Sequence, residues 1–108
     1  MIKVRIYDDA ITIDGHAKRD RNGDATCCAA VSAAVQTAAA FFDHKGYRYI
    51  VSPFEDHGGH FMLFTSMVKD DDRAMIQALI DILRAQADTW PDDMTVEVME
   101  NEDIRPDY

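Results

Sequence analysis

Two residues in the first third of the chain have side chains suited to covalent catalysis. His16 lies in the sequence Gly15-His16-Ala17, and Cys28 follows twelve positions later, at the start of Cys28-Ala29-Ala30-Val31-Ser32. A cysteine thiolate is a strong nucleophile, and a histidine can take up the thiol proton and later return it to a leaving group. A polar loop separates the two residues, so the folded chain can bring them together. The pattern predicts a small cysteine hydrolase.

A helix that begins near Cys28 would favour this chemistry. The sequence predicts a helix from about Thr26 to Lys45, with Asp24 or Thr26 as its cap, so that Cys28 falls in the first turn. Unpaired N–H groups and the positive end of the helix dipole stabilise a thiolate there. The backbone N–H groups of Cys28 and Ala29 are candidates for an oxyanion hole.

The residue types alone also fit a simpler interpretation. Free cysteines are often buried as small apolar residues, and His16 can simply mark the end of a strand. Spacing along the chain does not show that the two side chains meet. From the residues alone, both interpretations stay open.

The elements that would position these residues follow from hydrophobic periodicity. Alternating residues predict strands at Ile2–Ile6, at Ile11–Ile13 leading into His16, at Tyr47–Ser52 ending before Pro53, at about His60–Val68, and at Met94–Val98. A second helix is expected behind Asp70-Asp71-Asp72, with Ile76, Leu79, Ile80 and Leu83 on its apolar face and Trp90-Pro91 at its end. The order β-β-α-β-β-α-β predicts an α/β (α+β) two-layer sandwich, with two helices on one face of a mixed or antiparallel sheet.

Length and composition indicate one domain. The chain has 108 residues, and a hydrophobic content of 47% is enough for a core without disulfide bonds. We expect residues 1–100 to form the domain and residues 101–108 to form an acidic, frayed tail. We expect the N-terminal strand segment to be neither a signal peptide nor a membrane span, and we expect no other segment to span a membrane.

The net charge limits the kinds of partner that the protein is expected to bind, and the cysteine content indicates the compartment in which it is expected to work. With 20 acidic and 11 basic residues, the net charge of −9 disfavours binding to nucleic acid. Cys27 and Cys28 are adjacent, and a disulfide between neighbours is strained. Both are expected to be thiols in a reducing compartment, the cytoplasm.

The remaining motifs give no cofactor or metal site. His57 and His60 flank a Gly-Gly pair after Glu55 and Asp56, but zinc normally needs four well-placed ligands. We interpret this segment as a glycine turn with solvent-facing histidines, or as the border of a substrate groove. A phosphatase loop needs an arginine shortly after the cysteine, and no nucleotide-binding glycine loop is present. No cofactor is therefore expected.

The segment from Gly15 to Ser32 resembles the signature of the ribosomal processing cysteine protease (Prp) family. The matching residues are Gly15-His16-Ala17, Gly23 and Cys28-Ala29-Ala30-Val31-Ser32, and the element order and chain length are also similar. The resemblance implies that Cys28 is the nucleophile and His16 the base. It also matches Ser32, one helical turn beyond Cys28, to the serine of the motif, either as a hydrogen-bonding group near the site or as a small packing residue.

One position departs from the family pattern. Members usually carry an aspartate three positions before the cysteine, where this chain has Ala25. Asp24 is displaced by one residue, so a Cys-His dyad without an orienting carboxylate is the safer assignment. The register selects Cys28 over Cys27, and successive helical residues point about 100° apart, so Cys27 is expected to be packed.

The resemblance also implies a substrate. Family members remove a short N-terminal extension from a large-subunit ribosomal protein, after bulky aromatic residues, and form homodimers. Residues 18–25 are expected to become ordered when a peptide binds. Two alternatives remain open: a non-catalytic protein-binding module of the same fold, and the same protease acting on another target such as a phage structural protein.

Overall fold

The computed structural model describes residues 1–19, 21–23, 25–55 and 58–104. Its regular elements are β1 (Ile2–Ile6), β2 (Ile11–Gly15), α1 (Thr26–His44), β3 (Tyr49–Glu55), β4 (Gly58–Leu63), α2 (Arg73–Thr89) and β5 (Met94–Val98). Two short 3-10 helices, η1 (Thr65–Met67) and η2 (Asp70–Asp72), connect β4 to α2. The predicted order of strands and helices is confirmed.

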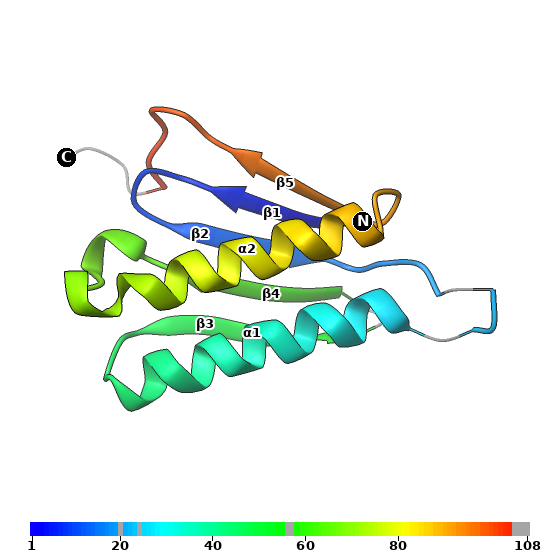
Figure 1. Ribbon diagram of the computed structural model, residues 1–108, viewed down its shortest axis with the longest axis horizontal. Helices are drawn as coiled ribbons and strands as arrows, with labels where there is room; N and C mark the ends of the chain where they lie inside the picture. The colour runs from blue at the N-terminus through cyan, green and yellow to red at the C-terminus, as the bar shows by residue number, and fades with distance from the viewer. Residues whose placement is uncertain (20, 24, 56–57, 105–108) are drawn as a thin grey trace.

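The strands form one five-stranded sheet in the order β3-β4-β2-β1-β5. All neighbours are antiparallel except β1 and β5, which are parallel, so the sheet is mixed. Both helices lie side by side on one face of the sheet, as Figure 1 shows. The predicted two-layer α+β fold is confirmed.

The core lies between the sheet and the two helices. On β2 and β4, alternate residues face the helices, and Ile13 pairs with Phe61 across the two strands. Burying each large apolar side chain contributes about 1.5–3 kcal/mol. The largest fully buried residues, contributed by both layers, include Phe42, Phe61, Ile2, Ile11, Ile13, Leu63, Leu83 and Met94.

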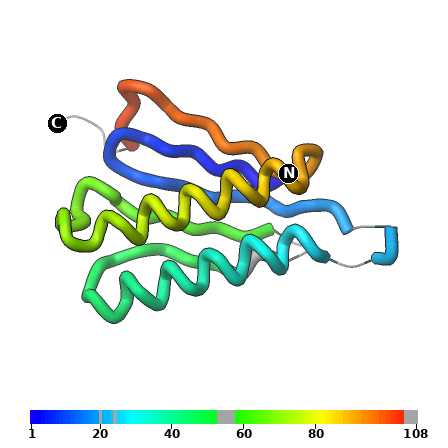
Figure 2. The backbone as a smooth tube through the Cα atoms, viewed as in Figure 1, coloured from blue at the N-terminus to red at the C-terminus, as the bar shows by residue number. Residues whose placement is uncertain are grey.

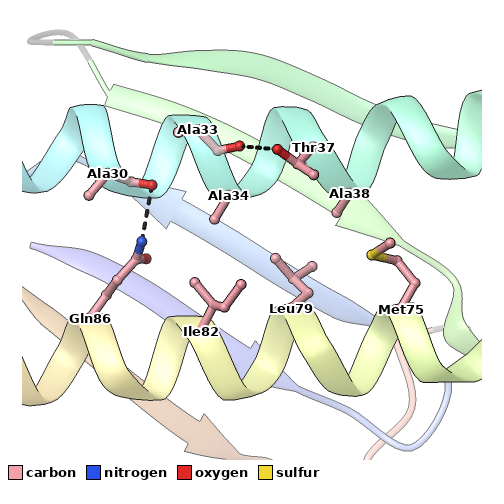
Figure 3. A pocket seen from close by; sticks show the side chains of 9 residues that line it. All are labelled: Ala30, Ala33, Ala34, Thr37, Ala38, Met75, Leu79, Ile82 and Gln86. Atoms are coloured by element: carbon pink, nitrogen blue, oxygen red, sulfur yellow. Dashed lines mark hydrogen bonds between the residues drawn. The ribbon is translucent and has the colours of Figure 1, made fainter.

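A run of small residues on α1 lets the two helices approach closely. Ala30, Ala34 and Ala38 face Leu79 and other residues of α2 across a shallow groove (Figure 3). At one end of the groove, the Gln86 side-chain amide donates a hydrogen bond of 3.0 Å to the Ala30 carbonyl oxygen. This bond fixes α2 to the first turns of α1.

By length and composition, α1 is apolar enough to cross a membrane, contrary to the expectation that no segment would be. Seven of its 19 residues are buried in the core. The apolar side of the helix is therefore covered by the sheet and by α2, as expected for a core helix.

The helix caps differ from those predicted. The N-cap of α1 is Ala25, which makes no side-chain cap bond, and Thr26 is already inside the helix. Asp24, the other predicted cap, lies outside the described residues. Asp72 is the N-cap of α2, yet its carboxylate makes no cap bond. It accepts a hydrogen bond from Tyr47 instead, because that hydroxyl lies within reach at 2.6 Å.

The third and fourth strands also have different bounds. β3 continues through Pro53 to Glu55, where the sequence predicted a stop. Proline is compatible with a strand at a sheet edge, where its missing N–H is not needed, and the register of β3 against β4 shifts between Ser52 and Glu55. β4 starts earlier and ends earlier than predicted, because the chain turns into η1 after Leu63.

Part of the expected acidic tail is held against the domain. The Asp8 N–H donates to the Glu102 carbonyl at 2.9 Å, and the Ile104 N–H donates to the Asp9 carboxylate at 2.8 Å. The chain is thus tied to the β1–β2 turn as far as residue 104. Fraying at residues 101–104 was a wrong expectation, because these backbone groups find partners in the turn.

Candidate active site

Three segments meet at one end of the sheet: the end of β2, the start of β4 and the start of α1 (Figure 2). In the register of β2 and β4, Asp14 is opposite His60 and Gly15 is opposite Gly59. The chain leaves the sheet after Gly15, and His16 and Ala17 follow in extended, irregular backbone. The end of β2 therefore brings the predicted base to the end of α1 that carries the predicted nucleophile.

Position 15 requires glycine, both because of its backbone conformation and because of the atoms around it. Its φ of +110° is a conformation that residues with side chains rarely adopt. A Cβ atom at this position would overlap the carbonyl oxygen of Met1, the residue directly before β1. Only glycine fits here, and its conformation sets the direction in which His16 leaves the sheet.

The Cys28 thiol lies against the backbone of Ala17. The Ala17 N–H donates a hydrogen bond of 3.2 Å to Cys28 Sγ, and the thiol contacts the Ala17 carbonyl oxygen at 3.9 Å. Only 2% of Cys28 is exposed, and Ala17 is buried as well. The Cys28 sulfur is thus held against the backbone of Ala17, one residue after His16.

His16 is the residue directly before Ala17, and its side chain is exposed. Throughout the described residues, no hydrogen bond joins the His16 imidazole to the Cys28 thiol. The structure thus brings the two segments together, with His16 exposed and the Cys28 sulfur buried.

Among the described residues, neither the N-cap nor the first turn of α1 carries an acidic side chain. Ala25 provides no side-chain cap. The Ala29 N–H donates to the Ala25 carbonyl at 2.9 Å, so this amide is already engaged in the helix. The other amide predicted for an oxyanion hole, that of Cys28, lies in the first turn of α1. Backbone N–H groups in the first turn have no acceptor within the helix.

Of the residues predicted to support the site, Ser32 has another hydrogen-bond partner, and Asp24 lies outside the described residues. The Ser32 hydroxyl accepts a hydrogen bond of 3.0 Å from the side chain of Gln36, one turn further along the helix. Asp24 is outside the described residues, so its proposed part in the loop has no structural description.

Cys27 occupies a different environment from Cys28. Burial, followed by the negative charge of Asp93, raises the pKa of the Cys27 thiol to about 11. Both cysteines are free and buried. At neutral pH the Cys27 thiol therefore stays protonated, in accord with a packing residue rather than a nucleophile.

A contact between a histidine and a carboxylate next to this end of the sheet was not predicted. Nδ1 of His60 contacts a carboxylate oxygen of Asp14 on the adjacent strand. His60 was expected at the start of a strand, beside a glycine turn with solvent-facing histidines; it lies within β4, and its partner became apparent only from the register of β2 and β4. His57 and Asp56 lie outside the described residues. In the part of the chain that is described, no three histidine, cysteine or acidic residues are grouped to hold a metal ion.

Comparisons with known proteins agree on the fold. The Staphylococcus aureus ribosomal processing protease Prp, solved with a covalently linked product peptide, matches with a TM-score of 0.72 and 22% identity, over 91% of this chain and 99% of that chain. The same S. aureus protease with a substrate peptide gives a TM-score of 0.68 and 21% identity, again over 91% of this chain and 99% of that chain. A Streptococcus mutans protein gives a TM-score of 0.68 and 17% identity, over 91% of each chain.

These identities are low, so the structural matches establish the fold. No curated protein sequence matches this chain. The family model described as Cysteine protease Prp matches residues 1–95, which include both His16 and Cys28. This match covers most of the sequence and agrees with the fold. The matched residues include the segments that meet at the end of β2. The chain belongs to the cysteine protease Prp family.

Proposed function

We propose that this protein is a cysteine endopeptidase that removes a short N-terminal extension from a large-subunit ribosomal protein. Cys28 is the nucleophile and His16 the general base and acid. The family supports the protease activity, and the S. aureus relative, described as a ribosomal processing protease, supports the substrate class. The observation that carries the site assignment is the 3.2 Å hydrogen bond from the Ala17 N–H to Cys28 Sγ.

The proposed reaction is acyl transfer in two steps. The Cys28 thiol gives its proton to the His16 imidazole, and the thiolate attacks the carbonyl carbon of the scissile peptide bond. The tetrahedral intermediate collapses, the C–N bond breaks, and the imidazolium gives its proton to the leaving amine. Water then attacks the thioester, with His16 accepting its proton, and releases the new carboxylate and the free thiol.

The start of α1 supports the charged states of this reaction. An N-terminus with no acidic residue in its first turn keeps its positive end available to a thiolate and to a developing oxyanion. The Cys28 N–H is the amide that we assign to the oxyanion. The Ala29 N–H is bonded to Ala25 and serves the helix instead.

Because Cys28 is buried, a peptide can reach its sulfur only after part of the surrounding structure moves. The sulfur is covered in the free protein, while Lys18 and Arg19 at the start of the connection between Ala17 and α1 are exposed. The Arg19 guanidinium donates to the Gly23 carbonyl at 2.6 Å, a bond that a peptide can replace. We include in the proposal that an extended peptide displaces this connection and that the connection then orders over it, which would limit cleavage of other proteins.

The proposal extends to a homodimer that acts in the cytoplasm. The free state of both cysteines is compatible with a reducing compartment. The outer strands β3 and β5 are sheet edges, and Ile50 and Val98 on them are exposed. Such edges are suitable for contact with a second copy.

The central test is cleavage of the ribosomal protein encoded in the same genome, with and without its extension. Wild type, Cys28→Ala and Cys27→Ala are incubated with it, and the products are identified by mass spectrometry. We expect cleavage by wild type and Cys27→Ala and none by Cys28→Ala. Equal cleavage by Cys28→Ala contradicts the nucleophile assignment. Binding without cleavage by wild type indicates a non-catalytic binding module.

A further inference from the structure

The Asp14–His60 pair lies close in sequence to the proposed base. Asp14 is two residues before His16, and the carboxylate contacts Nδ1 of His60 from the adjacent strand. The two side chains are partly open to solvent, with 44% of Asp14 and 37% of His60 exposed. Alternate residues of β2 face the helices, with Ile11 and Ile13 in the core, so Asp14 and His60 are on the opposite face of the sheet.

This pair is the last side-chain contact that the register allows between β2 and β4. The next pair along the strands is Gly15 opposite Gly59, and neither residue has a side chain. Glycine also gives the backbone its greatest freedom, because no Cβ restricts φ and ψ. Without the Asp14–His60 contact, the end of β2 would be held to β4 by backbone hydrogen bonds alone.

His16 therefore lies between two fixed points on opposite sides of the sheet. On one side, Asp14 is held to β4 by His60. On the other side, the Ala17 backbone is held to α1 by the Cys28 thiol. Catalysis requires the imidazole to reach the sulfur, and misplacement of a catalytic group by about 1 Å can reduce the rate about 100-fold.

We propose that Asp14 and His60 form a positioning pair that fixes the end of β2, and thereby the His16 imidazole, relative to Cys28. The inference rests on the proposed function in that it takes His16 as the base. Neither residue of the pair touches the substrate; both act through His16. Lys3 is opposite Asp14 on β1 and is the other charged residue in register with this carboxylate.

The first experiment measures kcat, KM and Tm of Asp14→Ala, His60→Ala and Asp14→Asn. We expect each alanine variant to lower kcat about 10- to 100-fold with KM nearly unchanged, because orientation and not peptide binding is lost. The asparagine variant should recover most of the activity, since its amide oxygen still accepts the His60 N–H. The double alanine variant should be no slower than either single variant, because the two residues act as one unit.

A matched control comes from α2, on the covered face of the sheet. The Gln77 side chain donates a 2.8 Å hydrogen bond to the Asp81 carboxylate, an exposed contact that likewise involves one acidic residue. Asp81→Ala removes the same charge and should leave kcat unchanged. A loss of kcat in Asp81→Ala equal to that in Asp14→Ala overturns the proposal, because the effect would then be one of net charge.

The second experiment tests whether the pair acts through His16. In a Cys27→Ala background, the rate of iodoacetamide alkylation of Cys28 is followed by mass spectrometry, with and without His16→Ala. We expect Asp14→Ala to slow alkylation about tenfold when His16 is present and to have no effect when it is absent. Equal slowing in both backgrounds, or no slowing in either, overturns the proposal.

The alkylation readout separates this inference from the proposed substrate. If wild type cleaves no ribosomal protein but Asp14→Ala still slows alkylation only in the presence of His16, the positioning role stands and the substrate assignment fails. If His16→Ala itself leaves alkylation unchanged, His16 does not activate the thiol. Both the base assignment and the positioning role are then overturned.

Discussion

The two ends of α1 are held in contrasting ways. At the C-terminal end, Gly46 adopts a positive φ of +81° just after the helix, and Tyr47 donates a 2.6 Å hydrogen bond to Asp72. Lys45 lies 3.3 Å from the same carboxylate, and the Lys69 N–H donates to the Tyr47 hydroxyl at 3.0 Å. Side chains thus tie this end to the start of α2.

At the N-terminal end, the contacts are made to backbone groups. Ala25 makes no side-chain cap bond, the Cys28 thiol contacts the backbone of Ala17, and the Gln86 amide of α2 donates to the Ala30 carbonyl. The C-terminal end of α1 is thus held by contacts between side chains, whereas the proposed nucleophile lies at the end that is held through backbone groups.

Replacement of the proposed base should have the largest effect on activity. We expect His16→Ala to lower kcat by about 1,000-fold or more, because the proposed mechanism assigns both proton transfers to His16. The side chain is exposed, so Tm should change little. Peptide cleavage assays and thermal unfolding measure the two effects. Activity close to wild type would remove His16 from the mechanism.

The two adjacent cysteines should differ strongly in reactivity. With a pKa of about 11, only about one Cys27 thiol in a thousand is ionised at pH 8. We expect Cys28 to be alkylated at least about 100-fold faster, because the raised pKa of Cys27 leaves little of its thiolate, whereas His16 is the base proposed for Cys28. Mass spectrometry of single Cys→Ala variants compares the rates. Faster alkylation of Cys27 would reverse the assignment.

Replacing a glycine near each end of α1 should have different effects on the free energy of unfolding. Gly15→Ala combines an unfavourable φ with overlap against the Met1 carbonyl, so we expect a loss of about 2–4 kcal/mol in the free energy of unfolding. Gly46→Ala meets open space at its own positive φ and should cost about 1 kcal/mol. Denaturant unfolding measures both values. Equal losses would show that the contact with Met1 does not restrict Gly15.

Removal of the Tyr47 hydroxyl should affect stability and leave catalysis intact. Tyr47→Phe removes a donor to Asp72 and an acceptor for the Lys69 N–H, so we expect Tm to fall by roughly 3–8 °C near neutral pH. The value of kcat should stay within about twofold, since the active-site end of α1 is not touched. A large loss of kcat at unchanged Tm would contradict the division between the two ends.

The pH dependence of Tm in Tyr47→Phe gives a finer test of the Tyr47–Asp72 hydrogen bond. The hydrogen bond from Tyr47, together with Lys45, holds the pKa of Asp72 below its ordinary value of 3.8, so this contribution is lost as pH falls through that range. The same bond raises the pKa of Tyr47 above 10.0, so the contribution is also lost at higher pH, once the hydroxyl ionises. The difference in Tm between wild type and Tyr47→Phe should be largest between about pH 5 and pH 9. A constant difference at all pH values would contradict this origin.

Local sequence patterns predicted the elements well and their ends less well. Alternation located β1, β2 and β5, and the apolar stripes located both helices. β3 passed the predicted stop at Pro53 because it is an edge strand, and edge position depends on the order of strands in the sheet. Asp72 is the N-cap residue of α2, but its carboxylate bonds to Tyr47, 25 residues away in sequence, rather than to its own helix.

The sequence by itself determined the two-layer fold and the residues with reactive side chains. Periodicity, glycines and residue types are local properties, and the segment from Gly15 to Ser32 carries them in one short stretch. The tertiary structure alone decided which groups meet: the Cys28 thiol with the backbone of Ala17, and Asp14 with His60. Those contacts depend on strand register and on where α1 begins relative to β2. Register is set by the packing of the whole sheet against two helices, so no single segment encodes it.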